Sequence, residues 1–145
     1  MALRTAIVMS PDRGGAFDIL QRMARLGLGG PIAGGRQYMS WIHETDLARA
    51  VNLLLDNEFD GPVNLAAPNP LPQRDFIRTL RQAVGMPIGL PATRWMATLG
   101  AFILRSDTEL LLKSRRVAPG RLTDAGFTFE FAEWTAAAQD LVRTK

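Results

Sequence analysis

The stretch GGPIAGGRQYMSWIHETDLARA, residues 29–50, decides how this 145-residue chain is expected to fold. A glycine-rich bend leads into a short apolar strand over 38–42, and a polar turn follows. Thr45 or Asp46 is expected to cap the next helix by accepting a hydrogen bond from a free first-turn N–H. Apolar residues then recur at the spacing of one helix face, at Leu47, Ala50, Val51 and Leu54. The pattern predicts a strand, a turn and a helix in succession.

Similar patterns predict strands and helices along the rest of the chain. Strands are expected at 4–9, 63–66 and 127–129. Helices are expected at 15–26, around Phe76, Ile77 and Leu80, and near the C-terminus with Phe131, Trp134, Ala138 and Leu141 turned inward. A further helix over 92–104 is apolar on nearly every side, so it is expected to be buried or packed against another subunit.

Five segments, in order along almost the whole chain, resemble segments of one protein family. The segments are RTAIVM at 4–9, GGA at 14–16, WIHETDL at 41–47, GPVNLAAPNP at 61–70, and RVAP with AGFTF within 116–129. They are similar to R-x-G-I-V-L, G-G-A-L, W-I-H-x-x-D-L, G-P-V-N-L-T-A-P-N-P and R-V-x-P…A-G-F-x-F of extended short-chain dehydrogenase/reductases. More narrowly, the chain resembles the nucleoside-diphosphate-sugar epimerase-like branch, which carries a C-terminal domain of unknown function.

The resemblance implies an α/β fold, the C-terminal portion of an NAD(P)-binding Rossmann-like enzyme with few strands and about five to six helices. Residues 1–60 would then end the Rossmann-like domain and begin the substrate region. Residues 61–145 would form the C-terminal, epimerase-associated substrate domain. The implied function is that of the substrate-side portion of a sugar-nucleotide-epimerase-like oxidoreductase or isomerase.

Two motifs on which this family's chemistry depends are absent from the sequence. No G-x-x-G-x-x-G turn between a strand and a helix is present to hold a cofactor pyrophosphate. The family's Tyr-x-x-x-Lys pair is also missing, because the only tyrosine is Tyr38 and Ile42 stands where the lysine would be. No catalytic residue is therefore predicted, and the chain is expected to be catalytically incompetent alone. Whether it serves as part of an enzyme or as a non-catalytic interaction module stays open.

The resemblance nominates binding residues on two sides of a cleft. Ile7, Val8 and Met9 end the strand that would pass near the nicotinamide of NAD or NADP in the full-length family, although no cofactor is expected for this chain alone. Gln37, Trp41 and Arg116 are the substrate-side candidates.

Each charged or titratable candidate also has a simpler interpretation. Arg116 matches an arginine that binds the diphosphate in nucleotide-sugar epimerases, where a bidentate bond is the physical reason, but a surface or capping arginine fits equally well. Met39 stands where classical epimerases have a second such arginine. Histidine is a common acid/base in enzymes, which makes His43 a candidate, yet its place between strand and helix favours a packed or backbone-bonded side chain.

Composition excludes several classes of protein. With no cysteine and one histidine, a disulfide framework is impossible and a transition-metal site is not expected. The net charge is +3, and the basic residues are spread along the chain and interleaved with acidic ones, so nucleic acid is not an expected partner. Arg74, Arg78 and Arg81 are read as a solvated helix face. No membrane span is expected and the cytoplasm is the expected location. The expected partner is either a missing N-terminal half or a second copy, bound through Trp95–Ile103.

Overall fold

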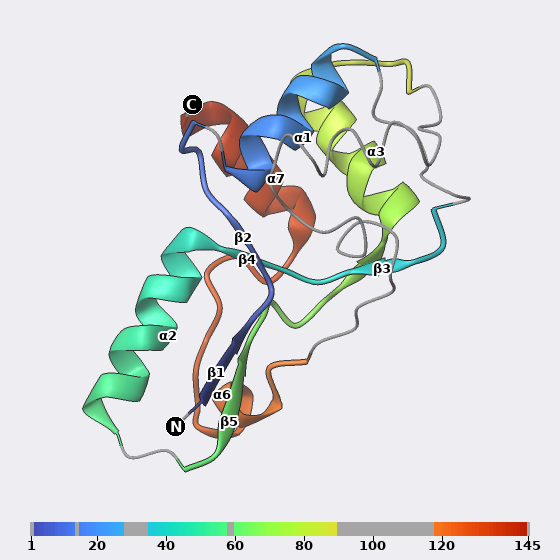
Figure 1. Ribbon diagram of the computed structural model, residues 1–145. Coiled ribbons are helices and arrows are strands. Elements are labelled where there is room, and N and C mark those ends of the chain that lie inside the picture. The colour runs from blue at the N-terminus through green and yellow to red at the C-terminus, as the bar shows by residue number, and fades with distance from the viewer. Residues whose placement is uncertain (1, 14, 28–34, 58–59, 90–117, 145) are drawn as a thin grey trace.

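A computed structural model of the protein describes residues 2–13, 15–27, 35–57, 60–89 and 118–144 (Figure 1). Within these ranges the chain has the expected α/β fold. Its helices are α1 (Ala16–Arg25), α2 (Glu44–Asp56), α3 (Gln73–Val84), α6 (Gly120–Asp124) and α7 (Trp134–Thr144). Its strands are β1 (Ala2–Thr5), β2 (Ile7–Met9), β3 (Tyr38–Met39), β4 (Trp41–His43), β5 (Pro62–Leu65) and β6 (Leu71–Pro72). The helix expected over 92–104, with its proposed self-association surface, lies outside the described residues.

The strand expected over 4–9 divides at Ala6 and gains two different partners. β1 pairs in parallel with β5, and β2 pairs in parallel with β4. At the division, the Ala6 N–H donates to the Leu65 carbonyl at 3.0 Å, whereas the Ile7 N–H donates to the Ser40 carbonyl at 3.3 Å. One short N-terminal stretch therefore connects the β4 region to the β5 region. β3 and β6 form a third, antiparallel pair.

The larger apolar core lies among α1, α3 and α7, which Figure 1 shows grouped at one end of the molecule. Trp134, at the start of α7, is its central residue. Its ring stacks on Phe76 of α3 with centroids 4.1 Å apart and lies 5.1 Å from the ring of Trp41 in β4. Its indole N–H donates to the Phe76 carbonyl at 2.9 Å, so the polar end of this buried side chain is satisfied.

A second core lies beneath α2, which runs beside β1 and β5 in Figure 1. Its buried members are Ile42, Ala50, Leu54, Val63, Leu65 and Leu122. β4 connects the two cores, because successive side chains of a strand point to opposite faces. Trp41 enters the first core and Ile42 the second, and both are fully buried.

The first turn of α3 is fixed by the backbone of 35–37. The N–H groups of Gln73 and Arg74 donate to the carbonyls of Gln37 and Gly35, at 2.7 and 3.0 Å. These two donors would otherwise have no partner inside the helix. Pro72 is the N-cap residue, just before the helix.

One expected strand is wrong: residues 127–129 are not in a strand. The Phe127 N–H donates to the Leu122 carbonyl at 3.0 Å, which closes α6. The rings of Phe127 and Phe129, whose alternation suggested a strand, pack edge to face with centroids 4.8 Å apart. Alternating aromatic residues here serve the packing of a loop.

No helix in the described ranges is long and apolar enough to cross a membrane. The proposed division of the chain at residue 60 stays a prediction.

Gly35 and Gly85 offer a matched test of the contact between residues 35–37 and the first turn of α3, which we call the α3 anchor. Both have positive φ (68° and 78°), but a Cβ on Gly35 would lie 2.6 Å from the Arg74 Cβ, whereas one on Gly85 would meet nothing within 4 Å. We expect Gly85→Ala to lower the free energy of unfolding by about 1 kcal/mol, from backbone strain alone. Gly35→Ala should lower it by roughly 2–4 kcal/mol, because overpacking adds to that strain. Urea denaturation measures both values, and equal losses would contradict the anchor.

Candidate functional site

His43 ends β4 and caps α2. Its Nδ1 accepts the Thr45 N–H at 3.0 Å, so the expectation that Thr45 or Asp46 caps this helix is wrong. Its Nε2 lies 2.9 Å from Oδ2 of Asp140 in α7, and its ring stacks on Phe131 with centroids 4.0 Å apart. Because Nδ1 accepts a hydrogen bond, the proton of the neutral ring sits on Nε2 and is donated to Asp140.

This environment makes His43 a structural residue. Its side chain is 3% exposed, and both ring nitrogens are engaged by protein groups. A general base needs a free lone pair within reach of a substrate proton, and this imidazole offers none. The interpretation of His43 as a packed, backbone-bonded residue is confirmed.

Asp46, one turn further along α2, is completely buried and holds a distant part of the chain. Its Oδ1 accepts the Glu130 N–H and its Oδ2 accepts the Phe131 N–H, both at 2.9 Å. The Arg49 guanidinium donates to Oδ1 at 2.9 Å. A buried carboxylate is tolerated only when such bonds replace its lost hydration.

His43, Asp46 and Arg49 together form what we call the α2 clasp. They are three residues apart, so they share one face at the start of α2. The Arg49 guanidinium also lies 5.1 Å from the centre of the Phe127 ring, a cation–π distance. The clasp therefore fixes the C-terminal segment beside β4 through charge, hydrogen bonds and ring stacking.

The predicted cofactor-side residues form β2. Met9 is fully buried in the first core, while Ile7 and Val8 are partly buried, one against each core. In the β2–β4 register, Ile7 lies opposite Trp41. The structure thus brings one predicted cofactor residue beside one predicted substrate residue, although contact with either ligand stays a prediction.

The three substrate-side candidates have different positions. Trp41 is fully buried and its Nε1 has no hydrogen-bond partner among the described residues. Gln37 is half-buried, and its carbonyl anchors α3. Arg116 lies outside the described residues. In the part of the chain that the structure describes, no three acidic, His or Cys side chains are grouped to hold a metal.

Comparison with known proteins finds one matching family model and relatives that are similar over nearly the whole chain. Residues 93–141 match the family described as Domain of unknown function (DUF1731). The mouse epimerase family protein SDR39U1 is 35% identical over 144 residues, which are 98% of this chain and 48% of the mouse protein. The chain corresponds to the C-terminal part of the epimerase family proteins. It spans about half the length of the relatives it matches.

Solved structures agree with this assignment. The crystal structure of human epimerase family protein SDR39U1 with NADPH has a TM-score of 0.87 and 30% identity, over 99% of this chain and 48% of that chain. The nucleoside-diphosphate sugar epimerase of Corynebacterium glutamicum has a TM-score of 0.67 and 30% identity, over 96% of this chain and 25% of that chain. The resemblance to the nucleoside-diphosphate-sugar epimerase-like branch is confirmed.

The partners of Asp46 and the role of Asp140 were not predicted from the sequence. For Asp46 a signal was present, because Asp46, Ala50 and Leu54 are four residues apart and form the buried stripe of α2. A carboxylate on an apolar stripe indicates a buried acceptor that needs donors. No comparable signal exists for Asp140, which is partly exposed at 42%.

The α2 clasp predicts that substituting two different aspartates lowers the free energy of unfolding by very different amounts. Asp46→Ala removes a fully buried carboxylate and leaves the N–H groups of Glu130 and Phe131 without their acceptor, so we expect a loss of about 3–5 kcal/mol in the free energy of unfolding. The control is Asp75→Ala, which removes the exposed Asp75–Arg78 pair on α3 and should cost less than about 1 kcal/mol. Urea denaturation followed by tryptophan fluorescence measures both. A loss below about 1 kcal/mol for Asp46→Ala would contradict the clasp.

Proposed function

We propose that this chain supplies the substrate side of an NAD(P)-dependent, sugar-nucleotide-epimerase-like oxidoreductase or isomerase, and that it is catalytically incompetent alone. One observation carries the proposal: the chain aligns with about half of the mouse and human SDR39U1 proteins and lacks both the glycine-rich turn and the Tyr-x-x-x-Lys pair. The chemistry of the assembled protein would be hydride transfer at a carbinol carbon, with a tyrosine as acid/base. We propose the cytoplasm as its location.

In this proposal the residues of this chain shape and support the cleft. β2 and β4 lie side by side, and Trp134 supports Trp41 from behind. The α2 clasp keeps the segment before Trp134 in place, which holds that support rigid. Gln37 would offer a polar contact to the substrate, and Arg116 would bind its diphosphate through a bidentate, charge-assisted bond.

We propose that the missing N-terminal half binds along β1. Among the described residues β1 pairs with β5 alone, and its Leu3 side chain is 45% exposed. Strands of parallel sheets in α/β proteins are normally buried, so an exposed apolar strand favours a further strand beside it. Because the Ala6 N–H faces β5, alternation along the strand turns the Thr5 N–H toward the opposite edge.

Docking along β1 is tested by removing one backbone donor. Thr5→Pro deletes the N–H that faces the open edge, and proline is tolerated on edge strands. We expect it to weaken association with a co-expressed N-terminal half of a family member at least tenfold, as measured by calorimetry. The control Thr5→Val keeps the donor and the β-branched shape, so it should bind as the unaltered chain does. Equal binding by both variants would show that the half docks elsewhere.

A chain that is catalytically incompetent by itself should show no turnover after purification. It should also show no saturable binding of NAD or NADP, because the phosphate-binding turn is absent from its sequence. Calorimetry measures the binding, and a coenzyme absorbance assay measures the turnover. The complex with an N-terminal half serves as the positive control. Micromolar binding of either dinucleotide by the isolated chain would refute this part of the proposal.

A further inference from the structure

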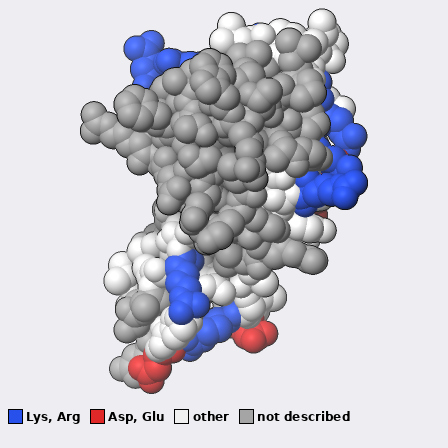
Figure 2. Space-filling model, turned by 45° about the vertical axis from the view of Figure 1, so that its right-hand side comes forward, with Lys and Arg blue, Asp and Glu red and all other residues white. Residues whose placement is uncertain are grey.

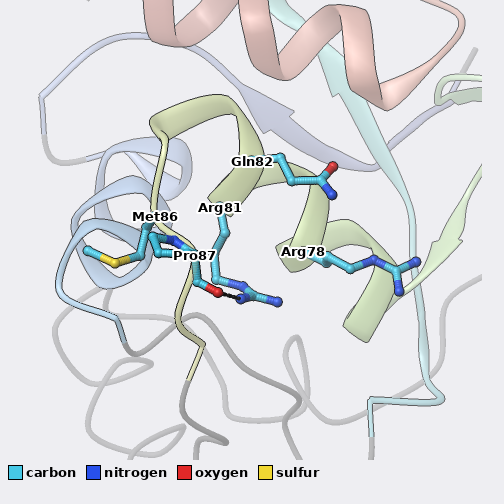
Figure 3. A pocket seen from close by; sticks show the side chains of 5 residues that line it. All are labelled: Arg78, Arg81, Gln82, Met86 and Pro87. Atoms are coloured by element: carbon cyan, nitrogen blue, oxygen red, sulfur yellow. Dashed lines mark hydrogen bonds between the residues drawn. The ribbon is translucent and has the colours of Figure 1, made fainter.

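A pocket with a volume of about 260 Å³ lies at the C-terminal end of α3. Its lining side chains are Arg78, Arg81, Gln82, Met86 and Pro87 (Figure 3). Among the residues that the structure describes, no predicted cofactor or substrate residue lines it. No described lining residue is acidic, and two of them carry a positive charge.

The turn after α3 makes the hollow and satisfies the end of the helix. Gly85 has φ 78°, its N–H donates to the Gln82 carbonyl at 3.2 Å, and the Met86 N–H donates to the Arg81 carbonyl at 2.9 Å. This is a Schellman closure, which returns the chain toward the helix. These two terminal carbonyls already accept hydrogen bonds. The partial negative charge at the end of α3 therefore attracts the nearby arginines less strongly.

Arg81 is held in place before any ligand arrives. Its Nη1 donates to the Pro87 carbonyl at 3.4 Å. Gly89 packs so closely on the guanidinium that a Cβ there would lie 2.5 Å from Cζ. The Arg81 Nε is buried and has no hydrogen-bond partner within the described residues. These contacts restrict where the Arg81 guanidinium lies, so less side-chain freedom would be lost when an oxyanion binds at the pocket.

Arg78 supplies a second positive charge from the same side of the helix. It is one turn before Arg81, and Figure 3 shows both side chains at the pocket. Arg78 is exposed and donates to Asp75 at 2.7 Å, and within the described ranges Asp75 is the only carboxylate bonded to this pair of cations. Figure 2 shows Lys and Arg side chains at several places on one face of the molecule, with the largest group at its right-hand margin.

We propose that this pocket binds a phosphate group, as inorganic phosphate or a small phosphate monoester. Guanidinium groups match the geometry of phosphate oxygens and bind them through paired, charge-assisted hydrogen bonds. Arg81 provides the positioned contact, Arg78 the second charge and Gln82 an amide donor. Met86 and Pro87 form the apolar side of the pocket.

The test compares two arginines of one helix in the full 145-residue chain. Inorganic phosphate is titrated at constant ionic strength and backbone amide shifts are followed by NMR. Arg81→Met should weaken binding at least tenfold. Arg74→Met removes the same charge from an exposed position outside the pocket and should change binding less than twofold. Equal weakening by both variants, or no saturable shifts at residues 78–87 of the unaltered chain, would overturn the proposal.

A second variant keeps every charge and moves only the guanidinium. Gly89→Ala places a methyl group against Arg81, so phosphate affinity should fall at least threefold while the thermal unfolding transition is retained. An unchanged affinity for phosphate would contradict the proposal that the position of the Arg81 guanidinium determines binding. Glycerol 3-phosphate, titrated in parallel, distinguishes the two ligand sources. Tighter binding than phosphate assigns the pocket to a monoester, and weaker binding assigns it to free phosphate.

Discussion

The buried carboxylate of Asp46 is the constraint on which the rest of the structure depends. It joins the start of α2 to the backbone at residues 130–131, a separation of more than eighty residues. Removing a carboxylate from water costs several kcal/mol, and two backbone donors with one guanidinium offset that cost only in this geometry. The C-terminal segment therefore has one position in which Asp46 is satisfied, and the fold adopts it.

The consequences extend from the clasp into the larger core. Once the Phe131 backbone and ring are fixed by Asp46 and His43, α7 begins at Trp134 in the register that stacks this ring on Phe76. Trp134 also contacts Trp41, which connects the C-terminal helix to the strand beside β2. The residues expected to line the cleft are thus held by a network that begins outside it.

The contacts of the polar residues also differ between the parts of the structure. His43 and Asp46 stand in the most recognisable motif of the sequence, yet they hold the C-terminal segment rather than a substrate. Within the described part of the chain, the arginines at the end of α3 have fewer partners and line an open pocket. β1, paired on one edge within the described residues, is where we propose that the other half of the protein docks.

The sequence by itself determined the α/β class, the family, and the places of α1, α2, α3 and β5, because periodicity and local motifs are properties of neighbouring residues. It did not determine that His43 caps α2, that residues 127–129 form a loop, or that Asp46 binds a distant backbone. It also did not show that one N-terminal strand would divide at Ala6 between two partners. These features join groups that are distant in sequence, and only tertiary packing decides which donor meets which acceptor once both have left water.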